Sequence, residues 1–70
     1  MRTKYLAVVE RAARNYSAYL PDVPGCVATG RTKAACLANL REALAMHLHG
    51  VVQDGMDLPR PCAEARLMSV

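Results

Sequence analysis

The side chains with the greatest potential for chemistry in this 70-residue chain are its cysteines and histidines. They are Cys26, Cys36, Cys62, His47 and His49. They lack the C-x-x-C and H-x-x-x-H spacings of common zinc sites, and two histidines placed two apart on a helix point about 200° apart. Free cysteines commonly serve as small buried apolar residues. The sequence therefore predicts no metal site.

A catalytic site needs an acid–base pair, an activated nucleophile or a phosphate-binding loop. The carboxylates are scattered without a D-x-D or E-x-x-H grouping, and the glycines form no G-x-G-x-x-G or P-loop pattern. We therefore expect a protein that is not an enzyme and needs no cofactor. The alternative in this class is a metal- or thiol-dependent enzyme that uses Cys26 or Cys62.

Positive charge is concentrated near the N-terminus of a chain whose formal net charge is +3. The basic residues there are Arg2, Lys4, Arg11 and Arg14, and Glu10 is the one acid among them. Such a group can attract nucleic acid, although basic residues without interleaved aromatics are more often solvated surface. A stand-alone nucleic-acid-binding module that uses these four residues is therefore an alternative function.

Length and composition limit the classes of protein to which this chain can belong. A chain of 70 residues is one small domain, and with 53% hydrophobic residues but no Trp or Phe its core must rely on Leu, Val, Ala and Met. Small side chains bury little area each, so we expect a homo-dimer, a higher oligomer or a complex with a partner. Three widely spaced cysteines and no leader-like or membrane-spanning apolar run favour the cytoplasm and no membrane association.

The elements that must position these side chains are arranged around the stretch 16–32. Residues 16–20 favour a strand, and the Pro24-Gly25 pair that follows has the residue order of a type II turn. Residues 26–29 resume as a strand, and Thr32 is the expected N-cap of a helix. An earlier β-prone run over residues 5–9 has two apolar faces and pairs back on residues 16–20.

The helix that begins after Thr32 is indicated by one apolar stripe. Leucine and valine recur every three or four residues at Leu37, Leu40, Leu44, Leu48 and Val51. Asp54-Gly55 is the expected end of the helix, and residues 63–70 alternate as a final strand. The predicted fold class is α+β, in the order β-β-β-α-β, with an antiparallel sheet and one long helix packed on one face.

Four short patterns in the chain resemble the HicB family of antitoxins. They are Y-S-A-Y-L-P-D-V-P-G-C at 16–26, G-x-T at 30–32, N-x-x-E-A-L at 39–44 and D-G-x-x-L-P-x-P at 54–61. The resemblance covers residues 3 to 70 and implies a partial ribonuclease-H-like fold in a single domain over residues 1–70. The chain stops after the expected last strand, so we expect no C-terminal DNA-binding domain and no operator binding by this chain alone.

The function that the resemblance implies is protein binding. HicB proteins neutralise HicA, a small messenger-RNA-cleaving toxin, by covering its active site. The residues expected to bind this partner are Tyr19, Asp22, Val23, Pro24 and Cys26. The alternative for Tyr19 and Asp22 is a structural role, in which the ring covers the sheet and the carboxylate caps its own turn.

Two features of this chain depart from the family pattern. Lys33-Ala34-Ala35 follows the threonine cap where the family often has an acidic residue, so the capping-box carboxylate is missing. A net charge of +3 also gives no electrostatic attraction to a basic toxin. Either the contact is mainly apolar or the partner differs.

Overall fold

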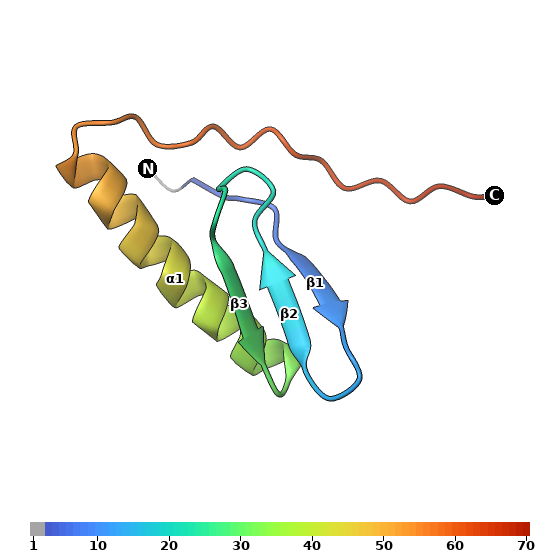
Figure 1. The fold of residues 1–70 in the computed structure, drawn as a ribbon. Coiled ribbons are helices and arrows are strands. Elements are labelled where there is room, and N and C mark those ends of the chain that lie inside the picture. Colours follow the sequence, from blue (N-terminus) through green and yellow to red (C-terminus); the bar gives the residue numbers. More distant parts are fainter. Residues whose placement is uncertain (1–2) are drawn as a thin grey trace.

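The computed structural model describes residues 3–70, so Arg2 lies outside the described residues. The elements follow the order β1 (Val8–Arg11), β2 (Tyr16–Tyr19), β3 (Val27–Gly30) and α1 (Lys33–Gln53). The strands form one antiparallel sheet in the order β1-β2-β3, and α1 lies across one face of it (Figure 1). The predicted α+β class, with one long helix on one face of an antiparallel sheet, is confirmed.

The strand register separates the two faces of the sheet. Val8 pairs with Tyr19, which pairs with Val27 on its other side, so these three side chains form a row on one face. Their neighbours one residue along point to the opposite face. Ala18 is one of these, and it is buried under α1 with 3% of its surface exposed.

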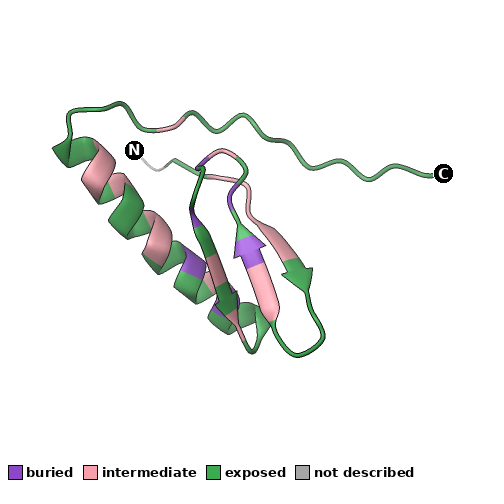
Figure 2. Cartoon of the chain, viewed as in Figure 1, coloured by how far each residue is buried: buried purple, intermediate pink, exposed green. Residues whose placement is uncertain are grey.

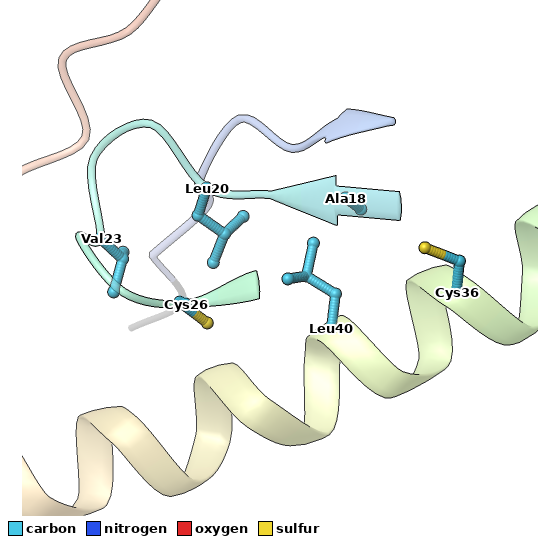
Figure 3. Close-up of a cluster of buried hydrophobic side chains, with 6 residues drawn as sticks. All are labelled: Ala18, Leu20, Val23, Cys26, Cys36 and Leu40. Carbon is cyan, nitrogen blue, oxygen red and sulfur yellow. The ribbon is translucent and has the colours of Figure 1, made fainter. Parts of the chain in front are cut away.

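The core lies between β2, the β2–β3 turn and α1. Its buried side chains are Ala18, Leu20, Val23, Cys26, Cys36 and Leu40, and Figure 3 shows them in the layer between the helix and β2 with the turn that follows it. All six are small or medium in size, as the lack of Phe and Trp requires. Purple segments are correspondingly few in Figure 2, and most of the chain is half-buried or exposed.

The first strand begins later than the sequence predicts, at Val8 instead of Tyr5. Its partner β2 ends at Tyr19, because the next residue, Leu20, enters the turn and donates its N–H to the carbonyl of Cys26. Residues 5–7 therefore have no β2 residues opposite them and do not belong to the sheet ladder. They still pack on the core through Tyr5 and Ala7.

Both predicted ends of α1 are confirmed. The Thr32 hydroxyl accepts a hydrogen bond from the N–H of Ala35 at 3.0 Å. At the other end Gly55 has φ +74°, its N–H donates to the carbonyl of Val52, and the N–H of Met56 donates to the carbonyl of Val51. These two bonds form a Schellman motif, which needs the positive φ that glycine adopts without strain.

The predicted final strand over residues 63–70 is wrong. This segment is extended but belongs to no strand, and it runs out past the sheet as the orange-to-red trace of Figure 1. Alternation of side chains predicts an extended backbone, but a strand also needs a neighbour with which to exchange hydrogen bonds. No part of residues 3–70 supplies that neighbour.

Candidate functional site

Two consecutive reverse turns connect β2 to β3. The N–H of Val23 donates to the carbonyl of Leu20 at 3.1 Å, and the N–H of Cys26 donates to the carbonyl of Val23 at 3.1 Å. Gly25 occupies the third position of the second turn with φ +83°, as a type II turn requires. The Pro24-Gly25 turn predicted from sequence is therefore confirmed.

This turn folds part of the predicted partner-binding site into the core. Val23 has 0% of its surface exposed and Cys26 has 4%, so neither side chain can contact a partner. Pro24 is exposed, and Tyr19 exposes 41% of its surface. Of the five residues expected to bind a partner, these two present their side chains most openly.

Asp22 holds the C-terminal segment against the turn. One oxygen of its carboxylate, Oδ2, accepts hydrogen bonds from the backbone N–H groups of Cys62 and Ala63, both at 2.8 Å. A second tether lies upstream, where the Tyr5 hydroxyl donates to the carbonyl of Pro59 at 2.7 Å. The carboxylate is therefore occupied by the chain's own backbone, although not by the turn that contains it.

The tyrosines divide into structural and surface roles. Tyr16 is half-buried and packs against the core cluster, which gives it a structural role. Tyr19 points to the opposite face of the sheet, between Val8 and Val27, and Val27 is 65% exposed. We call the row Val8–Tyr19–Val27 the outer apolar row.

The outer apolar row lies on the face of the sheet that α1 leaves open. A shallow hollow of about 500 Å³ is lined there by β2 and β3 residues that include Tyr19 and Val27. Glu10 and Ser17 pair beside the row and add a polar border to it. An apolar centre with a polar rim is the usual composition of a protein-binding surface.

Basic side chains gather at the other end of the sheet, where the β1–β2 loop meets the start of α1. A depression of about 300 Å³ is lined there by Arg11, Arg14, Arg31 and Lys33, and no acidic residue lines it. Arg31 and Lys33 were missed by the sequence analysis because they lie about twenty residues from the loop. Lys4 precedes β1 and therefore lies beyond the opposite end of that strand.

The cysteines do not form a reactive or metal-binding group in the part of the chain that the structure describes. Cys26 and Cys36 are buried, whereas Cys62 is exposed. Burial raises the pKa of the Cys26 thiol, which disfavours the nucleophilic thiolate. Across residues 3–70, no three histidine, cysteine or carboxylate side chains lie close enough together to hold a metal ion.

Comparison with known proteins identifies the family. Residues 5–69 match the profile described as the HicB-like antitoxin of bacterial toxin–antitoxin systems. Among solved structures, the chain is similar to one in a "HicA3 and HicB3 toxin-antitoxin complex", with 30% sequence identity and a TM-score of 0.69. The similarity covers 86% of this chain and 70% of that one.

Similarity to curated proteins extends over much of the chain. A 14.9 kDa protein of Haemophilus phage HP1, described as uncharacterized, is 34% identical to this chain over 80% of its residues. The matched region makes up 42% of the phage protein, so this chain spans less than half of that relative's length. A UPF0150 protein of Thermoplasma acidophilum is 29% identical, and the similarity covers 87% of this chain and 90% of that protein. Among the described residues, no helix is both long and apolar enough to cross a membrane. On the evidence of its profile and its fold, the chain belongs to the family of HicB-like antitoxins of bacterial toxin–antitoxin systems.

Proposed function

We propose that this chain neutralises a HicA-type, messenger-RNA-cleaving toxin by binding to it and covering its active site. The family match over residues 5–69 carries the proposal. The similarity to a chain of a HicA3–HicB3 complex supports the class of partner.

The outer apolar row is the surface that we propose for the toxin. It lies on the sheet face away from α1, and its exposed members Tyr19 and Val27 come from two adjacent strands. Tyrosine suits such a surface because it combines a large apolar ring with a polar tip. Pro24 extends the same end of β2 and β3, while Val23 and Cys26 act indirectly by holding the turn in shape.

The charge of the chain favours an apolar contact. A net charge of +3 gives no long-range attraction to a basic ribonuclease, so the binding energy has to come from buried apolar surface. Association with the toxin should therefore depend only weakly on salt concentration. This property separates toxin binding from a contact with nucleic acid.

A pair of matched valine substitutions tests the proposed surface. Val27 and Val52 are 65% and 61% exposed, so Val27→Asp and Val52→Asp introduce the same charge at similar exposure on the sheet and on the helix. We expect Val27→Asp to weaken toxin binding at least about tenfold, or about 1.4 kcal/mol, and Val52→Asp to leave it nearly unchanged. Calorimetric titration with the product of the neighbouring short reading frame gives the affinities.

Circular dichroism and thermal melts establish that both variants fold. Equal affinity of the two folded variants for the toxin would place the contact elsewhere on the molecule. Failure of the wild-type chain to bind the toxin at all would remove the proposed function itself.

Nucleic-acid binding is a second candidate function, and the basic depression favours it. Arg11, Arg14, Arg31 and Lys33 surround a concave surface without an acidic side chain among its lining residues. Two of them belong to the group of four that the sequence suggested, whereas Lys4 lies apart and Arg2 is outside the described residues. Arginine and lysine in a concave setting can contact several phosphates of one backbone.

Salt dependence distinguishes this function. If about four phosphates are neutralised, the logarithm of the binding constant should fall with the logarithm of salt concentration at a slope of about −3 to −4. The double variant Arg11→Glu with Arg14→Glu should abolish binding in a fluorescence anisotropy assay with labelled RNA. Lys4→Glu with Arg60→Glu changes the net charge equally at exposed sites outside the depression and serves as the control.

An equal loss of RNA binding in the two double variants would indicate that net charge alone attracts the RNA. No binding of RNA or DNA to the wild-type chain at low salt would exclude the second function.

A further inference from the structure

The segment Glu64–Val70, which we call the arm, has no packing contact in the described chain that would bury it. The Asp22 carboxylate fixes the backbone as far as Ala63. Beyond that point Leu67 is 105% exposed and Met68 is 88% exposed. Figures 1 and 2 show the arm running outward, away from both the sheet and the helix, and exposed along its whole length. Large apolar side chains in this position are a feature of binding segments more than of solvated loops.

The arm already has the conformation of a strand. Arg66 donates to the Glu64 carboxylate at 3.2 Å, and such a pair between residues two apart places both side chains on the same side of an extended backbone. Ala65 and Leu67 therefore lie on the other side. From Glu64 to Leu67 the arm thus has one charged side and one apolar side, as in a strand with one solvated face.

The same chain carries an unpaired sheet edge. Within residues 3–70, β1 pairs with β2 on one side, and its other side faces no strand. The residues just before β1, Tyr5 to Ala7, belong to no strand and have no ladder bonds of their own. The free N–H and C=O groups of an edge strand are a template for pairing with a further strand.

An apolar groove lies beside this edge. It has a volume of about 210 Å³, and its apolar lining comes from the segment before β1, the turn after β2 and α1. The apolar lining residues are Tyr5, Ala7, Leu20, Leu37, Leu40 and Leu44. The groove is therefore an open side of the small core, and Tyr5 and Ala7, which line it, come just before the edge strand β1.

We propose that the arm docks as an additional strand on the β1 edge of a second copy of this chain, with Leu67 directed to the groove beside that edge. Each copy carries one arm and one β1 edge, so a two-fold exchange pairs each arm with the β1 edge of the other copy. The Asp22 tether supports exchange, because it holds the arm on a course that leads away from its own sheet. Addition of a strand to a sheet edge is a recurrent mode of protein association.

The exchange is independent of toxin binding, which we place on the outer apolar row. The outer row lies on a face of the sheet, whereas the arm occupies an edge. A dimer can therefore form in the absence of toxin, and the two proposals can fail separately.

Mass measurement of the 70-residue chain and two variants, without toxin, tests the exchange. Light scattering coupled to size-exclusion chromatography, over a range of protein concentrations, should give the wild-type chain twice the 7.6 kDa of a single chain. Leu67→Asp places a charge on the apolar face of the arm and should reduce the mass to that of a monomer. Arg66→Asp places the same charge on the other face, where the ion pair is exposed, and should leave the dimer intact.

Far-UV circular dichroism should show the same helix content in all three proteins, because the arm contributes no helix. A monomeric wild-type protein would overturn the proposal. A dimer that survives Leu67→Asp would overturn it as well, because the copies would then be joined by another surface. If the wild-type chain is monomeric and Leu67→Asp prevents toxin binding, the arm binds the toxin instead.

Discussion

Gly30 is placed where the backbones of two elements approach each other. It is the last residue of β3, and a Cβ atom built on it would lie 2.5 Å from the N atom of Cys36 and 2.8 Å from its Cα atom. Gly50, in contrast, lies in α1, and a Cβ atom there would have no neighbour within 4 Å. The two glycines therefore have opposite energetic roles, one required by packing and the other a cost to the helix.

Alanine substitution at these glycines should shift stability in opposite directions. Gly30→Ala must push α1 away from β3, and we expect it to lower the free energy of unfolding by about 1–3 kcal/mol. Gly50→Ala should raise it by up to about 1 kcal/mol, because alanine loses less entropy in a helix. Thermal melts at one fixed protein concentration measure both effects, at about 4–8 °C per kcal/mol for a domain of this size. A stabilised Gly30→Ala variant would contradict the packing described here.

Single residues were predictable from the sequence where their role depends on nearby residues only. Gly25 and Gly55 adopt the positive φ values that their turn and cap patterns indicate. The role of Asp22 was not predictable, because its hydrogen-bond partners are backbone groups about 40 residues away. The burial of Val23 likewise follows from how the turn folds back on α1, which its neighbours in the sequence do not specify.

At the scale of elements, α1 begins with an incomplete set of capping interactions. The Thr32 hydroxyl accepts from the N–H of Ala35, but no acidic residue occupies the first turn. Lys33 instead places a positive charge near the positive end of the helix dipole. The first turn of α1 is therefore less stable than it would be with a complete capping box.

Capping variants should change the stability of the helix in a predictable order. Thr32→Ala removes the acceptor for the Ala35 N–H and should cost about 1 kcal/mol. Ala35→Glu completes a capping box at an exposed site and should add about 0.3–1 kcal/mol. Urea unfolding followed by circular dichroism gives both values. If Ala35→Glu is neutral or destabilising, the glutamate does not complete the capping box.

The predictions were correct for elements that depend on one segment alone and wrong only where an element depends on a partner strand. The α1 stripe and its two ends were predicted because periodicity and capping are properties of one segment. The start of β1 was predicted three residues early, because the length of a ladder depends on where the partner strand turns. Residues 63–70 were predicted as a strand because they alternate, yet within the described chain they have nothing to pair with.

At the scale of the whole molecule, one helix covers one face of a three-stranded sheet, and we assign a partner to three surfaces of the described chain that it leaves open. These are the outer apolar row, the β1 edge with its groove, and the basic depression. The basic depression lies at the end of β2 that is away from the β2–β3 turn. The sequence predicted Tyr19 and two of the basic residues but could not group them, because each surface combines segments that meet only after folding. The α+β class itself followed from the order of the segments and from the family resemblance.

In the function that we propose, the chain binds and neutralises a toxin ribonuclease. The most direct measurement is messenger-RNA cleavage by the product of the neighbouring short reading frame, with and without this chain, together with the mass of the co-purified complex. We predict a stable complex and loss of cleavage, retained in Val52→Asp and reduced in Val27→Asp. Undiminished cleavage in the presence of folded wild-type chain, with no complex recovered, would contradict the claim.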